Sequence, residues 1–168
     1  MGDLPSFNTY QLMKIIVDSR EQLPLKFSHP FITEVIVQKL DVGDYGVEFE
    51  DKHRPPFYFD RKSIGDLFGT MGNGYPRFKE CIKRAQESDV RLFIIIEGTL
   101  TDCLKGYEHS SLEGVSVVYK LFTLWVKYGI IPVFCSSREE MASYIVNFYI
   151  AVGKRYIKDR HEKEKLLH

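Results

Sequence analysis

Two short polar segments carry side chains that could together hydrolyse a phosphodiester bond. Asp60 and Lys62 lie two residues apart in the segment 57–62, whose composition is typical of a strand, so their side chains should point to the same face. Asp44 follows Gly43 at a break between strands and could bring a second carboxylate beside Asp60. Two hard oxygen ligands suit Mg²⁺, a bound metal activates water, and a lysine can orient that water or stabilise charge on the phosphate. The pattern predicts a metal-dependent nuclease centre.

Each of these residues also has a purely structural interpretation. An Asp-x-Lys triplet arises on many polar strand faces, and Asp44 could simply be a turn residue. Asp66 follows Ser63 at the spacing of a helix-capping pair. Arg20 and Glu21 could form a surface ion pair that contributes little to stability. What favours the nuclease interpretation is the order in which these segments occur along the chain.

Three ordered segments resemble the nuclease domain of the XPF, Mus and Hef endonucleases. They are residues 16–21 (IVDSRE), 42–45 (VGDY) and 60–66 (DRKSIGD), and the resemblance extends over about residues 14–153. Asp60 stands where the family motif usually has Glu. The resemblance implies a restriction-endonuclease-like α/β fold with a mixed central sheet flanked by helices. It also implies dependence on Mg²⁺ or Mn²⁺ and cleavage of branched, flapped or forked DNA.

The same resemblance implies roles for individual acids and for one lysine. Asp44 and Asp60 would bind the metal, and Lys62 would act on water or phosphate. Asp18, at the end of the first strand, would complete the acidic cluster.

Arginines are the expected phosphate contacts. Arg61 would contact phosphate or hold the acids in place, and Asp66 would orient Arg61 or Lys62. Arg77 and Arg84 lie one heptad apart and could follow a phosphate strand, although a solvated helix face is the alternative. The full set of expected DNA contacts is Arg20, Arg61, Arg77 and Arg84.

The elements that must position these residues alternate along the chain. The apolar run 92–96 is typical of a strand covered on both faces, and the glycine-rich segment 69–76 predicts a loop. Strands are expected at 14–18, 35–40, 45–49, 57–62, 91–97 and 130–135, and helices at 63–68, 77–87, 112–128 and 139–156. These elements predict one sheet with helices on both faces and with Asp18, Asp44 and Asp60 in one cleft.

Length and composition predict a single domain with little excess charge. The chain has 168 residues, with 23 Lys and Arg against 23 Asp and Glu, so DNA binding would depend on local patches. The expected divisions are a lead-in (1–13), a nuclease domain (14–157) and a frayed charged tail (158–168). Three widely spaced cysteines argue against a disulfide framework. No apolar run is long enough to span a membrane, so we expect an intracellular protein of cytoplasm, nucleoid or nucleus that is neither secreted nor membrane-bound.

The C-terminal half predicts a homodimer. The last helix is apolar around much of its circumference, so one sheet could not cover it and a second copy would contact Phe148 and Tyr149. The preceding helix has an apolar stripe typical of a core face, formed by Leu112, Val115, Val118, Leu121, Phe122 and Trp125. Val117, Leu124 and Val126 lie outside this stripe, on other sides of the helix. Two alternatives remain open at this point: a catalytically silent DNA-binding or dimer-partner module on the same fold, and a nuclease that acts on plain duplex DNA.

Overall fold

A single mixed sheet forms the centre of the protein. The structure, a computed structural model, describes residues 10–167, so most of the expected lead-in and the last residue lie outside the described part. The strand order is β2-β1-β3-β4-β5-β6, and β3 runs antiparallel to β1 and β4 while the other neighbours are parallel. The expected α/β fold class is confirmed. The strands are β1 (Met13–Asp18), β2 (Ile32–Gln38), β3 (Tyr45–Phe49), β4 (Phe57–Ser63), β5 (Arg91–Glu97) and β6 (Ile131–Cys135).

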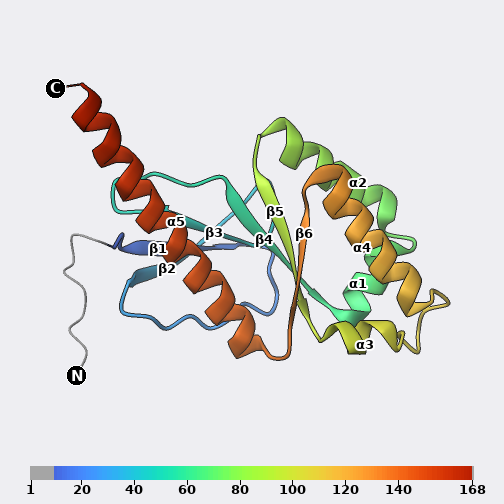
Figure 1. Ribbon diagram of the computed structural model, residues 1–168. Helices are drawn as coiled ribbons and strands as arrows, with labels where there is room; N and C mark the ends of the chain where they lie inside the picture. The colour runs from blue at the N-terminus through green and yellow to red at the C-terminus, as the bar shows by residue number, and fades with distance from the viewer. Residues whose placement is uncertain (1–9, 168) are drawn as a thin grey trace.

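Helices cover both faces of this sheet (Figure 1). The long helix α5 (Arg138–Leu166) lies across one face, and the remaining helices lie on the other side. These helices are α1 (Ile64–Met71), α2 (Tyr75–Glu87), α3 (Leu100–Leu104) and α4 (Gly114–Tyr128). The short helix α3 was not predicted, although Thr99 and Asp102 form a capping box at its start.

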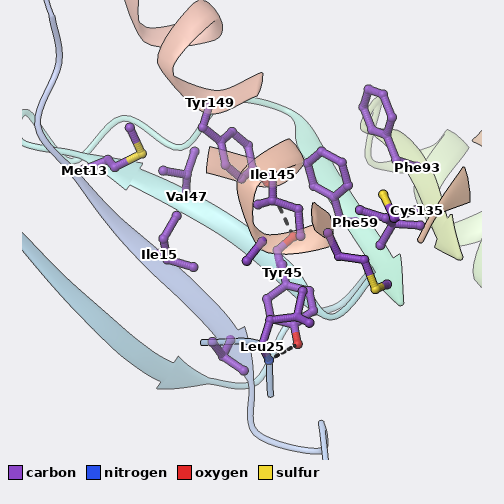
Figure 2. Packing of buried hydrophobic residues seen from close by; sticks show 14 of the residues in the cluster. Met13, Ile15, Leu25, Tyr45, Val47, Phe59, Phe93, Cys135, Ile145 and Tyr149 are labelled. Carbon is purple, nitrogen blue, oxygen red and sulfur yellow. Dashed lines mark hydrogen bonds between the residues drawn. The ribbon is translucent and has the colours of Figure 1, made fainter. Parts of the chain in front are cut away.

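The larger core lies between α5 and the sheet. Figure 2 shows Ile145 and Tyr149 of α5 pointing toward side chains of β1, β3 and β4. Tyr149 is fully buried, and its hydroxyl donates to the Phe57 carbonyl at 2.7 Å. The Tyr45 hydroxyl accepts a hydrogen bond from the Leu25 amide at 2.9 Å. These bonds satisfy the polar ends of two buried tyrosines and tie the loop after β1 and the start of β4 to this core.

The end of α5 is helical where a frayed tail was expected. Tyr156 stacks on His53 with ring centroids 4.2 Å apart, and its hydroxyl donates to Asp51 Oδ2 at 2.7 Å. Arg160 binds the same carboxylate oxygen at 3.0 Å. These partners lie in the hairpin between β3 and β4, so the helix is held up to Arg160 by contacts that local charge could not reveal.

The buried face of α4 also differs from the predicted stripe. The helix buries Val117, Val118, Leu121 and Leu124. Val115, Phe122 and Trp125, which the pattern placed in the core, are exposed. Among residues 10–167, no helix is long and apolar enough to cross a membrane.

Candidate active site

A tight turn places Asp44 between two strands of the sheet. Gly43 has a φ of 75°, and a Cβ there would lie 3.0 Å from the Phe59 carbonyl oxygen, so glycine is strongly favoured. The Asp44 amide donates to the Phe59 carbonyl at 2.7 Å, and the Asp44 carbonyl accepts from the Asp18 amide at 2.7 Å. Bonds to β1 on one side and β4 on the other fix the residue.

Asp44 and Asp60 form a close pair of carboxyl groups. Asp44 Oδ2 accepts the Arg61 amide at 2.7 Å, and the two acids lie within hydrogen-bonding reach of each other. Burial, followed by the charge of Asp60, raises the pKa of Asp44 to about 8. The structure therefore brings together the two predicted metal ligands, in a place where their mutual repulsion favours a proton or a cation.

Lys62 lies beside this pair, as its spacing from Asp60 predicts. Its Nζ is 3.4 Å from the Asp60 carboxylate and 5.4 Å from the centre of the Phe78 ring. The side chains of Lys62 and Asp60 are largely buried, with 13% and 14% of their surface exposed. The lysine charge is therefore held at the wall of the site.

Glu21 is the site residue that sequence reasoning missed. It does not pair with Arg20; instead it forms a two-pronged bond with Arg61, with Nη2–Oε1 at 2.8 Å and Nε–Oε2 at 3.0 Å. Burial opposes its ionisation, but the bonds from Arg61 and from the Leu23 amide outweigh burial and lower the pKa of Glu21. Glu21 is the last residue of the segment 16–21, and this position was the sequence feature that could have identified it as a site residue.

Asp18 does not join Asp44 and Asp60 in the cleft, so this expectation needs correction. Its side chain is 2% exposed and is saturated by bonds from Arg20 and from the Leu40 amide. Burial opposes ionisation here as well, but the Arg20 and Leu40 bonds lower the pKa of Asp18. This carboxylate anchors the segment before Asp44 to the end of β1.

Asp66 contributes to the start of α1 through its backbone. Its amide donates to Ser63 Oγ at 3.1 Å, so Ser63 is the N-cap of α1. Within residues 10–167 its carboxylate makes no hydrogen bond or ion pair with Arg61 or Lys62. It lies exposed at the edge of the cleft.

An open cleft of about 760 Å³ surrounds the carboxyl pair. Arg20, Arg77 and Arg84 line it with exposed side chains, whereas Arg61 is largely enclosed. Three of the four arginines expected to contact phosphate therefore line the cleft with exposed side chains, and of these the Arg20 guanidinium is already paired with Asp18. The glycine-rich turn between α1 and α2 also lines it.

The donor set fits a magnesium-like ion. Within residues 10–167 no group of three or more His, Cys, Asp or Glu side chains is arranged to hold a metal ion. Mg²⁺ commonly takes only one or two protein carboxylates and keeps several waters. Asp44 and Asp60 supply that pair. Burial, followed by the charge of Asp60, raises the pKa of Asp44, and a divalent cation would favour its ionised form.

Comparisons with known proteins agree with this architecture. The model of the ERCC4 domain family matches residues 17–148. A structure of XPF from Aeropyrum pernix in complex with DNA is similar, with 21% identity and a TM-score of 0.60, over 84% of this chain and 65% of that chain. Another structure of XPF from Aeropyrum pernix has 20% identity and a TM-score of 0.59, over 89% of this chain and 69% of that chain. The chain thus spans about two thirds of the length of these XPF chains. No curated protein matches it.

The family match covers most of the chain and includes every residue of the carboxyl pair, the lysine and the cleft arginines. The similar XPF structures show the same fold. The resemblance that the three sequence motifs carry is confirmed. The chain belongs to the ERCC4 domain family.

Proposed function

We propose that this protein is a Mg²⁺- or Mn²⁺-dependent endonuclease that hydrolyses phosphodiester bonds in branched, flapped or forked DNA. The observation that carries this proposal is the meeting of Asp44 and Asp60 beside Lys62 in an open cleft with exposed arginines. The family supports nuclease chemistry, and the similar XPF chain in complex with DNA supports DNA as the substrate.

Asp44 and Asp60 would hold the metal, which when bound polarises the phosphate and lowers the pKa of a nucleophilic water. Lys62 orients that water or stabilises negative charge on the phosphate, since its Nζ is fixed beside Asp60. The backbone amide of Arg61 holds Asp44 in place through its 2.7 Å bond. Arg20, Arg77 and Arg84 contact the phosphates that flank the cleaved bond.

Cleavage of a panel of DNA substrates tests the proposal. Flap, fork, nicked and linear duplexes of identical sequence are incubated with Mg²⁺ or with EDTA. We expect cleavage of the flap or fork in Mg²⁺ and none in EDTA. Preferential cleavage of linear duplex would contradict the substrate class, and binding of every DNA without cleavage would indicate a silent DNA-binding module.

We propose further that the protein is a homodimer through its C-terminal half, with an interface that differs from the expected one. Tyr149 is buried in the core, and Phe148 is partly covered by its packing against Phe57 and Phe93, so the two offer a partner little exposed surface. The exposed side of α4 instead presents a continuous apolar surface, formed by Val115, Tyr119, Phe122, Trp125 and Val126. Such a surface is typical of a contact with another protein.

A further inference from the structure

Glu21 and Arg61 form the most enclosed ion pair in the described part of the chain. Their side chains are 6% and 10% exposed. The carboxylate also accepts bonds from the Leu23 amide at 3.2 Å and from the Tyr45 hydroxyl at 3.4 Å. A buried ion pair is costly to form unless its geometry is good, so its presence at the wall of the cleft calls for a functional explanation.

We infer that Glu21 is a positioning residue that holds the Arg61 guanidinium away from the Asp44–Asp60 pair and so keeps both carboxylates available for a divalent cation. This inference rests on the proposed function, because it concerns the same metal centre. It assigns Glu21 a role in which it contacts neither metal nor DNA.

The position of Arg61 shows why such control is needed. Its backbone amide bonds Asp44 Oδ2, and its side chain lies near enough to Asp44 for the two charges to attract. A guanidinium released from Glu21 could therefore pair with Asp44, since arginine binds carboxylates in a two-pronged manner. An arginine bound there would neutralise the acid and compete with the metal.

Other contacts of the pair agree with a positioning role. Both Glu21 oxygens are already occupied by Arg61, with Leu23 and Tyr45 as further donors, which leaves them poorly placed to be ligands. The other carboxylate that pairs with Arg61 among the described residues is Glu97, which is 3.8 Å away and 35% exposed. Glu21 is therefore the main restraint on the guanidinium.

The test is the Mn²⁺ affinity of the full chain without DNA, measured by titration calorimetry or electron paramagnetic resonance. Glu21→Gln should weaken Mn²⁺ binding about tenfold or more, the scale typical of groups that support metal ligands. In the double variant Glu21→Gln/Arg61→Gln the affinity should return to near the wild-type value, because no guanidinium remains to compete. Glu21→Asp keeps the charge but shortens the side chain, so its Mn²⁺ affinity should lie between those of wild type and Glu21→Gln. It replaces Glu21→Gln in the test if that variant folds poorly.

The matched control is Glu48→Gln. Glu48 is a similarly covered carboxylate, 2.8 Å from Arg54 and outside the cleft, so its loss should leave Mn²⁺ affinity unchanged. Equal affinity of wild type and Glu21→Gln would overturn the inference but not the proposed nuclease. Weak binding that Arg61→Gln does not rescue would also overturn it, because Glu21 would then be a ligand. If wild type binds Mn²⁺ and the variants change the Mn²⁺ affinity as expected, but wild type cleaves no DNA, only the proposed function is refuted.

Discussion

At the scale of residues, two carboxyl groups sit close together because the backbone holds each of them separately. Asp44 is fixed by a turn bonded to β1 and β4, and Asp60 lies within β4. Repulsion between the two groups when both are ionised is unfavourable for the fold, and such arrangements cluster at functional sites. The distribution of bonds also separates the roles, since Lys62 contacts only Asp60 of the two acids, and the Arg61 amide bonds only Asp44.

Substitutions should separate metal binding from the later steps of the reaction. Asp44→Asn and Asp60→Asn should lose Mn²⁺ affinity and cleavage together. Lys62→Ala should retain Mn²⁺ affinity and lose cleavage by about 100-fold or more, because the lysine acts on water or phosphate rather than on the metal. Mn²⁺ titration and single-turnover cleavage measure the two properties, and full activity of Lys62→Ala would refute its assigned role.

Metal affinity should depend on pH through Asp44. Its pKa is raised to about 8, first by burial and then by Asp60, so below pH 8 the metal-free carboxyl holds a proton that a cation must displace. The affinity for Mn²⁺ should therefore rise by up to about tenfold per pH unit between pH 6 and 8 and level off above pH 8. Calorimetry in buffers of different ionisation enthalpy would count the released proton. An affinity that stays flat over this range would contradict the raised pKa.

Sequence patterns predicted that the two acids and the lysine would lie together but did not predict every partner. Asp44, Asp60 and Lys62 could be predicted because strand alternation and a turn place them within a short segment of chain. Asp18 and Glu21 could not be distinguished, since both are acids next to the end of β1. Only the path of the chain after β1 directs Asp18 to the Leu40 amide and Glu21 to Arg61.

At the scale of elements, the strands were predictable because their apolar runs are short and clearly interrupted. Each predicted strand is present, although β2 begins earlier than expected. The buried face of α4 was not predictable, because a helix with apolar residues around its circumference offers several stripes of equal quality. Packing against β6, α1 and α3 selects one of them.

The end of α5 depends on a partner distant in sequence, and this dependence can be tested. Tyr156→Phe removes the bond to Asp51 and should cost about 1 kcal/mol of local stability. Backbone hydrogen exchange in residues 157–166 should then quicken by about fivefold, while the first turns of α5 stay protected. Tyr144→Phe on the same helix is the control. Unchanged exchange in Tyr156→Phe would show that the contact does not hold the helix end.

At the scale of the whole molecule, two layers of helices cover the sheet, but no element within residues 10–167 covers the outer side of α4. Val126 is 90% exposed and Tyr119 73% exposed. The charged cleft lies elsewhere, at the end of β4 and along α2. An assembly through α4 would therefore leave the cleft open to DNA.

Light scattering should show a wild-type mass of twice the 19.6 kDa chain at tens of micromolar. Phe122→Glu with Val126→Glu should give a monomer with unchanged Mn²⁺ affinity, because a charge in an apolar contact is strongly unfavourable. Val37→Glu is the control, since Val37 is an exposed valine on the edge strand β2, far in sequence from α4. A monomeric wild type would rule out the dimer.

The proposed function requires the Asp44–Asp60 pair to direct metal-dependent cleavage of DNA. Single-turnover cleavage of a flap DNA by wild type and Asp60→Asn, each in Mg²⁺ and in EDTA, tests this requirement. We expect cleavage by wild type in Mg²⁺ only, and a rate for Asp60→Asn in Mg²⁺ that is lower by about 1,000-fold. Cleavage by wild type in EDTA, or by Asp60→Asn at the wild-type rate, would contradict it.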